Sequence, residues 1–310
     1  MRIGLRSMAK DCFARRVHTV TNYADIGKIY PSRVIDYHKD LGVDEDIALG
    51  NMSFCSLDDG NFLVSVRQFN YMLSPGSAKC NFIRDFMLDR GYHFIVVDQS
   101  FKFMKRLECD FNGLDMKEDI RLVRFGDIIQ ASGTDVSYGS GHHRMSCSIL
   151  KMDEKGLRRI RESFFPVEKE KNYIPVEGGQ GVFLTDLMDG CINISTLSNV
   201  SKKTAIQCSG LRKYRGSSQL VRYGGGYVAL VHRRDHERFY NAFAFFDKGL
   251  LTCRISDEFV VFRDESPISF CCGMSVSGDI ATLPMCVHDK TTHLFELPLT
   301  DFRATAKARV

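Results

Sequence analysis

The chain has 310 residues, of which 44% are hydrophobic, 26% charged and 11% aromatic. These fractions are close to the average for folded proteins and exclude disordered, collagen-like and coiled-coil chains. The formal net charge is +4, from 42 Lys and Arg against 38 Asp and Glu, and the sequence holds no run of five basic residues. Nucleic acid is therefore not expected as a partner.

Eleven cysteines are scattered along the chain without a CxxC pair. This spacing fits neither a usual zinc site nor a disulfide framework. The N-terminus lacks the apolar run of a signal peptide, and no stretch approaches the roughly 18 apolar residues of a membrane span. The sequence therefore predicts a cytoplasmic protein with reduced cysteines, no bound metal ion and no membrane span.

Segments rich in β-branched and aromatic residues predominate, whereas the periodicity of long helices is scarce. Short helices fit only within residues 1–40 and over 81–90. In chain order, the strands with the clearest signal are predicted over 62–67, 93–97, 121–125, 227–232 and 259–262. The chain is therefore predicted to be all-β.

Five turn sequences rich in Gly, Asp and Asn stand before short apolar strands that end in polar residues. Their glycines, from Gly60 to Gly278, lie on average about 55 residues apart, which is near the size of one four-stranded propeller blade. We therefore expect a five-bladed β-propeller with polar strand ends facing a central cavity. An irregular pair of β-sandwiches is the alternative. Residues 45–310 would form the propeller and catalytic domain, and residues 1–44 a short N-terminal extension.

Two segments place charged or hydroxyl side chains directly before predicted strands. In the first, Asp119 begins a strand and Arg121 follows two residues later, so both could be held rigidly and point into a cavity. A surface salt bridge beside a strand is the alternative. In the second, Lys213 and Arg215 precede Gly216, Ser217 and Ser218, a combination that could grip a phosphate or a sugar. An exposed, solvated turn is the alternative there.

The chain resembles glycoside hydrolase family 130 and its transferase relatives, a group that contains β-mannoside phosphorylases and related mannosyltransferases. The likeness runs from about residue 51 to residue 299. Five segments carry it, in the order of the family: Asn51-Met-Ser53, Arg67-Gln-Phe-Asn70-Tyr71, Glu118-Asp119-Ile-Arg121-Leu, Glu170-Lys-Asn172-Tyr-Ile-Pro and Arg215-Gly-Ser-Ser-Gln219. The fold that the resemblance implies is a five-bladed β-propeller, in agreement with the spacing of the turns.

The resemblance also implies roles for individual residues. Asp119 would be the general acid that assists departure of the glycosidic oxygen. The remaining site residues would hold the two substrates: the sugar by Asn51, Ser53, Arg67, Asn70, Arg121, Asn172, Tyr240 and Asp289, and phosphate by Lys213, Arg215 and His232. Ile120 stands where the family has a proline, and the segment from Arg215 to Gln219 departs from the family's glycine- and proline-rich stretch.

The charges favour phosphate as the second reactant. An inverting hydrolase needs a second carboxylate roughly 6.5–9.5 Å from the acid, and Glu118, Glu177 and Asp289 stay open as candidates for that base. Phosphate is already an anion and needs only cations to hold it. The chain offers Lys213, Arg215, Arg233, Arg234 and His232 for this. Together with the resemblance, which implies mannose as the sugar, this predicts an inverting enzyme that transfers a β-linked sugar between phosphate and a saccharide acceptor. No cofactor is expected, and inorganic phosphate or a sugar 1-phosphate would be the co-substrate.

Two other functions remain open at this point. One is a glycosyltransferase that builds a polysaccharide from an activated sugar donor, suggested by the departure between Arg215 and Gln219. The other is a glycan-binding propeller without catalysis, which the presence of Asp119 and Arg121 disfavours. In each case the expected partner is a small-molecule saccharide, and association into a homo-oligomer is left open.

Overall fold

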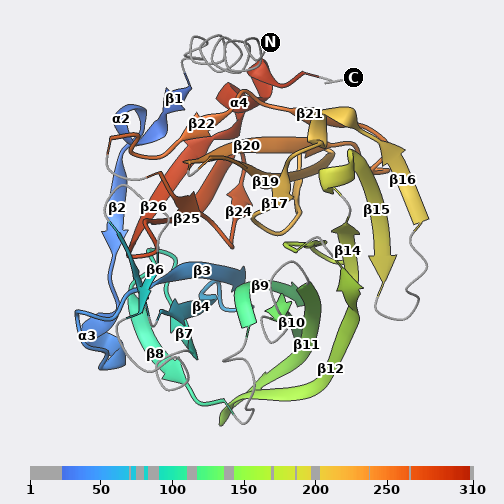
Figure 1. The fold of residues 1–310 in the computed structure, drawn as a ribbon. Helices are drawn as coiled ribbons and strands as arrows, with labels where there is room; N and C mark the ends of the chain where they lie inside the picture. The colour runs from blue at the N-terminus through green and yellow to red at the C-terminus, as the bar shows by residue number, and fades with distance from the viewer. Residues whose placement is uncertain are drawn as a thin grey trace, which may run out of the picture.

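In the computed structural model, strands predominate and surround a central axis (Figure 1). The predictions of an all-β chain and of a β-propeller are confirmed. Among the described residues, three short α-helices, α2 (Ile26–Ile29), α3 (His38–Leu41) and α4 (Leu299–Thr305), lie near the ends of the chain. The structure describes residues 23–69, 71–74, 80–82, 91–109, 117–135, 143–168, 171–185, 187–196, 203–236, 238–264 and 267–307.

Three regular sheets, which we number 1 to 3, each consist of four antiparallel strands in chain order. In each sheet the first strand lies nearest the axis and the last lies at the periphery (Figure 1). Sheet 1 contains β3 (Leu49–Ser56), β4 (Phe62–Gln68), β7 (Gly91–Val97) and β8 (Phe103–Leu107). Sheet 2 contains β9 (Lys117–Phe125), β10 (Ile128–Asp135), β11 (His143–Asp153) and β12 (Gly156–Glu168). Sheet 3 contains β13 (Ile174–Pro175), β14 (Val182–Thr185), β15 (Cys191–Thr196) and β16 (Lys203–Gln207).

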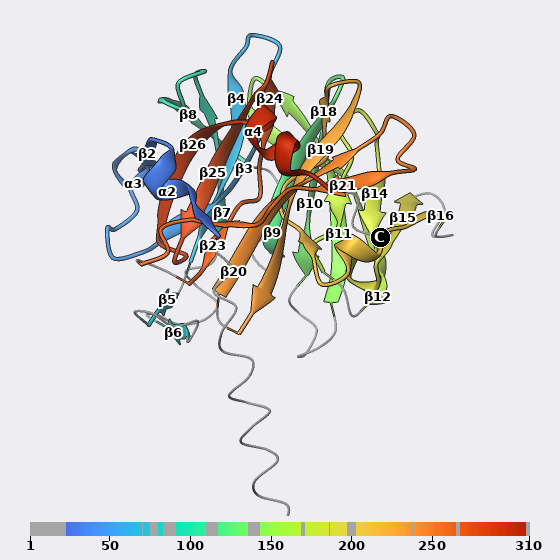
Figure 2. The ribbon, with the colours of Figure 1, turned by 90° about the horizontal axis from the view of Figure 1, so that it is seen from above.

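Two further sheets, 4 and 5, take in strands from the N-terminal part of the chain. Sheet 4 contains β17 (Arg215–Gly216), β18 (Val221–Tyr223), β19 (Gly226–Asp235), β20 (Arg238–Phe246), β21 (Cys253–Ile255), β22 (Phe259–Val260) and the parallel β1 (Ala24–Asp25). Sheet 5 contains β23 (Ser269–Phe270), β24 (Ser275–Ser277), β25 (Ile280–Val287), β26 (Thr291–Pro298) and β2 (Ser32–Ile35). A separate hairpin of β5 (Tyr71–Leu73) and β6 (Cys80–Phe82) extends beyond the sheets at one end of the axis (Figure 2).

The expected count of five blades is not confirmed, because four blades are recognised in this arrangement. The irregularity lies in sheets 4 and 5, whose innermost strand is broken into two pieces. Strands β17 and β18 both pair with β19, and strands β23 and β24 both pair with β25. The spacing of turns in the sequence does not reveal such breaks.

The described part of the N-terminal segment packs against the propeller. Strand β2 pairs with β26, so that Ser32 lies opposite Phe295 and Ile35 opposite Thr292. The side chain of Ile26 is fully buried. A strand near the start of the chain thus completes the sheet formed by its end. The domain boundary at residue 44 stays a prediction.

The helix predicted over 81–90 falls largely outside the described residues, and its first two residues belong to β6. The apolar core consists of five clusters, each packed between two neighbouring sheets. For example, Leu63 of sheet 1 and Leu122 of sheet 2 share one cluster, whereas Leu294 of sheet 5 and Val64 of sheet 1 share another. Among the described residues, no helix is long and apolar enough to cross a membrane.

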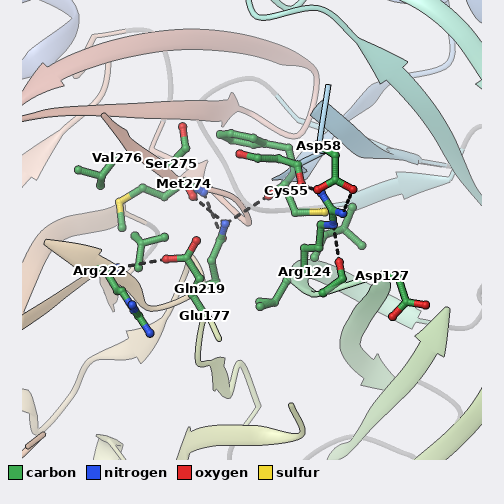
Figure 3. A pocket seen from close by; sticks show the side chains of 16 residues that line it. Cys55, Asp58, Arg124, Asp127, Glu177, Gln219, Arg222, Met274, Ser275 and Val276 are labelled. Carbon is green, nitrogen blue, oxygen red and sulfur yellow. Dashed lines mark hydrogen bonds and ion pairs between the residues drawn. The ribbon is translucent and has the colours of Figure 1, made fainter. Parts of the chain in front are cut away.

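Buried polar side chains close the axis between its two ends. The guanidinium of Arg121 is fully buried and donates hydrogen bonds to the main-chain oxygens of Asp119 (2.9 Å), Gly216 (3.1 Å) and Ser217. The side-chain amide of Gln219 donates to the main-chain oxygens of two other sheets, at Phe54 (3.3 Å) and Met274 (2.7 Å). Figure 3 shows Gln219 in this bridging position, at the floor of a hollow of about 510 Å³.

Candidate active site

A cavity of about 740 Å³ lies at the other end of the axis, where innermost strands begin and second strands end. It brings together eight residues that the sequence places in the site: Asn51, Arg67, Asp119, Asn172, Lys213, Arg215, His232 and Asp289. These residues come from sheets 1, 2, 4 and 5 and from the connections before sheets 3 and 4. Their joint location is a property of the fold, because they are far apart in the sequence.

Five of these lining residues have a left-handed backbone, which non-glycine residues seldom adopt. Their φ angles are 43° for Asn51, 54° for Asp119, 69° for Asn172, 88° for Lys213 and 49° for Asp289. Such a conformation costs of order 1–3 kcal/mol in each case and is concentrated at functional sites. The backbone therefore points to this cavity independently of the side chains.

β-Bulges produce this conformation in strands β3 and β9. Between the pairs Gly50–Arg67 and Ser53–Ser65, two residues of β3 face a single residue of β4. Strand β9 has the same irregularity around Asp119, opposite the step from Ser132 to Thr134. A bulge adds one residue to a strand and redirects its side chains. Asn51 and Asp119 are thereby turned into the cavity.

The carboxyl group of Asp119 is buried and held by two donors. Its Oδ1 accepts a hydrogen bond from Nδ2 of Asn51 at 3.0 Å and another from Nη1 of Arg67 at 3.3 Å. The other terminal nitrogen of Arg67 lies 3.3 Å from Oε1 of Glu118. Arg67 thus bridges two neighbouring carboxylates and fixes the orientation of Asp119.

Glu118 is held in its ionised form. Burial opposes ionisation, but the charges of Arg67 and of Lys171, whose Nζ lies 3.3 Å from Oε2, outweigh it and lower the pKa of Glu118 to about 2. A carboxylate with such a low pKa is a weak base. Glu118 is therefore a poor candidate for activating water.

The other two carboxylates considered as a base lie in different places. Glu177 lines the hollow at the opposite end of the axis (Figure 3) and is excluded by its position. Asp289 lines the cavity, and its Oδ2 accepts a hydrogen bond of 3.0 Å from the hydroxyl of Tyr71. Burial raises the pKa of Asp289 above its usual range, although Arg67 and Tyr71 act in the opposite direction. Asp289 therefore holds a proton more readily than an exposed aspartate.

His232, which the sequence assigns to phosphate, lies in the wall of the cavity. Its ring stacks on Phe239 at 5.2 Å between centroids, and its Nδ1 lies 2.8 Å from Oγ of Ser217. Burial lowers the pKa of His232 well below its usual range, and the charges of Arg121 and Arg215 lower it further. The imidazole is therefore neutral and can offer phosphate a hydrogen bond but not a charge.

One wall of the cavity is cationic. Lys213 is exposed, and Arg215 lies in the β17–β19 ladder opposite His232. Arg233 and Arg234, at the end of β19, also line this wall and are two of the cations that the sequence offers for phosphate. Tyr71, next to Asn70 in its motif, lines the cavity as well. Lys171 was missed, and its position directly before Asn172 is the signal that could have identified it.

Three predicted site residues do not line the cavity, and two of them, Arg121 and Tyr240, contact residues that do. The hydroxyl of Ser53 accepts a hydrogen bond of 2.9 Å from the main-chain nitrogen of Leu122, which links sheets 1 and 2. Arg121 contacts main-chain oxygens along the axis, including that of Asp119. Tyr240 lies under the guanidinium of Arg233, which is 4.3 Å from its ring centroid.

Other parts of the predicted motifs are either outside the described residues or in the core. Asn70 and Glu170 belong to the first group. Ser217 and Ser218 are fully buried, and the hydroxyl of Ser218 accepts a hydrogen bond from the main-chain nitrogen of Leu230. The two serines are therefore not placed to grip a phosphate in the cavity. In the part of the chain that the structure describes, no cluster of three His, Cys, Asp or Glu residues could hold a metal ion.

The chain matches no model of a known protein family and no curated protein in sequence. In structure it is similar to the β-1,2-mannobiose phosphorylase from Listeria innocua, with a TM-score of 0.58 and 13% identity over 84% of this chain and 92% of that one. A putative glycoside hydrolase from Bacteroides ovatus gives a TM-score of 0.51 and 12% identity over 81% and 86% of the two chains. The GH43_1 enzyme from Xanthomonas citri, in complex with xylose, gives 0.51 and 8% over 86% and 90%.

These likenesses confirm at the level of the fold the resemblance that the sequence motifs indicated. The neighbours named above are a glycoside phosphorylase and glycoside hydrolases, so the fold is one that carbohydrate-active enzymes use. At 8–13% identity the comparison shows the fold alone. The reaction has to be inferred from the residues of the site.

Proposed function

We propose that the protein is a carbohydrate-active enzyme that transfers a β-linked sugar, mannose, between phosphate and a saccharide acceptor with inversion. The observation that carries this proposal is the position of Asp119. Its carboxyl group is fixed by Asn51 and Arg67 in the same cavity to which sheet 4 contributes a wall of cations. A general acid and an anion site are the two elements that phosphorolysis requires.

In this mechanism, Asp119 donates its proton to the glycosidic oxygen as the bond to the anomeric carbon breaks. An oxygen of phosphate, held by Lys213 and Arg215, attacks that carbon from the opposite face. The electron pair of the broken bond remains on the departing oxygen, which becomes a hydroxyl. Because phosphate is already an anion, no second carboxylate is needed as a base.

The sugar would be held through its hydroxyl groups. The side-chain oxygens of Asn51 and Asn172 are buried and have no hydrogen-bond partner within the described residues. A buried acceptor without a donor is costly, and a sugar hydroxyl would satisfy each of them. Arg67, Asp289 and Asn70 would complete the sugar site, whereas Arg121 and Tyr240 would act through the residues that they support, and Ser53 would only link sheets 1 and 2.

Transfer from an activated donor is less well supported. This alternative was considered because the sequence from Arg215 to Gln219 departs from the family pattern. Three residues of that stretch, from Ser217 to Gln219, are buried and bonded within the core rather than directed to the cavity. The departure from the family pattern is therefore explained by packing.

The five sheets are also the basis for a proposal on the fold. We propose that each sheet is a blade and that the propeller has five. Five apolar clusters support this count, because each lies between two neighbouring sheets and together they close a ring from sheet 1 through sheet 5. The cytoplasmic location, the absence of nucleic-acid binding and the state of association stay predictions.

The test is phosphate release from α-mannose 1-phosphate offered with mannose or mannobiose. We expect release that requires the acceptor and is lost in Asp119→Asn, while the exposed Asp127→Asn retains it. Circular dichroism would verify that both variants are folded. Turnover by a folded Asp119→Asn protein would exclude Asp119 as the acid. No release by the wild-type protein, followed by transfer from a nucleotide sugar, would favour the activated-donor alternative.

A further inference from the structure

The cationic wall depends on a short connection between sheets 3 and 4. This connection runs from Cys208 through a 3₁₀ turn (Ser209–Leu211) to Tyr214 and carries Lys213 next to its end. Lys213 is exposed and has a left-handed backbone, so the direction of its side chain is set largely by the residues on either side. Tyr214 is one of these, and its side chain is buried.

The hydroxyl of Tyr214 donates a hydrogen bond to a buried carboxylate, that of Glu258. Glu258 follows strand β21 at the outer part of sheet 4, and its side chain is only 8% exposed. Its Oε1 accepts a hydrogen bond from the hydroxyl of Tyr214 and another of 2.6 Å from Nε of Arg233, while its Oε2 accepts one of 2.8 Å from Nη2 of Arg233. Such a bidentate pair fixes the guanidinium plane as well as its charge.

Arg233 is held from other sides too. Its guanidinium lies above the ring of Tyr240, and its Nη2 donates a hydrogen bond of 3.1 Å to the hydroxyl of Tyr23. Arg233 lines the cavity between His232 and Arg234 in the sequence. Glu258 therefore links the two segments that carry the cationic wall. It contacts the connection before β17 through Tyr214 and strand β19 through Arg233.

We propose that Glu258 is a positioning residue for the anion-binding wall of the cavity. By holding Tyr214 and Arg233 together, it fixes Lys213 and Arg215 on one side and Arg233 and Arg234 on the other. The identity of the anion as phosphate rests on the function proposed above. The positioning of the four cations by Glu258 rests on its contacts with Tyr214 and Arg233.

Two physical effects predict opposite results when the charge of Glu258 is removed. If Glu258 acted only through its charge, its loss would make the wall more positive and strengthen the binding of an anion. If it acts by positioning, its loss removes the bidentate partner of Arg233, leaves only Asp235 as a carboxylate partner at 3.3 Å and frees the flanking cations, which weakens binding. The direction of the change therefore separates the two roles.

The experiment is calorimetric titration of the full-length protein with inorganic phosphate, in the wild type, Glu258→Gln and Tyr214→Phe. We expect the dissociation constant to rise about tenfold or more in Glu258→Gln and about threefold in Tyr214→Phe. Glu154→Gln, which removes an exposed carboxylate and changes the net charge equally, should bind phosphate as the wild type does. The affinity for mannose should stay unchanged in all three variants.

Unchanged or tighter phosphate binding by a folded Glu258→Gln protein would overturn the proposal. If that variant does not fold, Tyr214→Phe, which keeps the ring, decides the question in the same way. A wild-type protein that binds neither phosphate nor sulfate would overturn it as well. Phosphate binding that depends on Glu258 without any turnover would instead contradict the proposed function and leave the positioning role supported.

Discussion

The side-chain amide of Asn51 and the carboxyl group of Asp119 lie 3.0 Å apart, and each residue occupies a β-bulge with a positive φ angle. The two bulges belong to neighbouring sheets. A single hydrogen bond therefore joins two backbone irregularities, and each one fixes the direction of the other's side chain. The orientation of the proposed acid is built into the backbone rather than left to side-chain rotamers.

The strain at Asn51 can be measured by comparing two substitutions. Asn51→Gly and Asn51→Ala both remove the amide, but glycine adopts φ of 43° freely and alanine does not. We expect Asn51→Ala to have a free energy of unfolding about 1 kcal/mol lower than that of Asn51→Gly, as measured by urea denaturation. Equal stability of the two variants would show that the backbone relaxes at this position.

Arg121 is expected to be indispensable for stability. Arg121→Met would leave three buried main-chain oxygens without their donor and should lower the free energy of unfolding by roughly 3 kcal/mol or more. Arg124→Met is the matched control on the same strand, because Arg124 pairs with the largely exposed Asp58. The free energy of unfolding of Arg124→Met should lie within about 1 kcal/mol of that of the wild type. Similar losses in the two variants would contradict the structural role of Arg121.

The ion pair between Lys171 and Glu118 predicts a pH dependence. The pKa of Glu118 is lowered to about 2 from its usual 4.5, so its ionisation stabilises the fold above pH 4.5, and that contribution is lost as the pH falls toward 2. Lys171→Met should raise this pKa and reduce stability at pH 6 by on the order of 1 kcal/mol.

The difference between wild type and Lys171→Met should disappear as the pH falls to 2 and below, because only there does Glu118 become protonated in both folded proteins. Urea denaturation at pH 6 and at pH 2 measures it. Lys28→Met, which breaks an exposed pair with Asp264, is the control and should change little at either pH. A stability difference that does not depend on pH would exclude Glu118 as its source.

The contact between Cys208 and Cys253, at the boundary of sheets 3 and 4, predicts an unusual pH dependence for the alkylation of the Cys208 thiol. A hydrogen bond from the thiol of Cys253 lowers the pKa of Cys208 to about 6, against the opposing effect of burial. The rate of alkylation of Cys208 by iodoacetamide, followed by mass spectrometry, should therefore level off above about pH 7.

In Cys253→Ala the donor is lost, and the rate of alkylation of Cys208 should go on rising to pH 9. Cys55 is an internal reference, because burial raises its pKa to about 12 and it should stay unlabelled. Identical pH profiles of Cys208 in the two proteins would show that the thiols do not interact.

The sequence located the cavity better than it distinguished the roles of residues within it. Polar residues at strand ends, such as Asn51 and Asp119, interrupt apolar patterns and are visible in the sequence. Ser53 and Arg121 follow them by two residues, and in a regular strand residues two apart share a face. Only the bulges separate each pair, so that one member enters the cavity and the other enters the core. No periodicity predicts where a bulge falls.

Tyr240 was assigned to the sugar site through the family resemblance, but it lies one strand further from the axis, opposite Arg233 in the β19–β20 ladder. Arg233 could be recognised in the sequence as a cation for phosphate, but its partner Glu258 could not, because their contact joins parts of the chain that are distant in the sequence. The charge of His232 could not be judged either, since it depends on burial and on Arg121 and Arg215, which are distant in the sequence. Contacts between sheets decide such properties.

The pairing of β2 with β26 has a consequence for how the chain folds. Ser32 and Phe295 must meet before sheet 5 is complete, although almost the whole chain separates them. Contacts between such distant residues form slowly, because a long loop has to close first. The ring can therefore close only after β26 has left the ribosome. Until β2 pairs with it, the edge of β26 is exposed to pairing with other chains. For this protein the closure of the ring by pairing of β2 with β26, rather than the formation of any single sheet, is the step at which folding competes with aggregation.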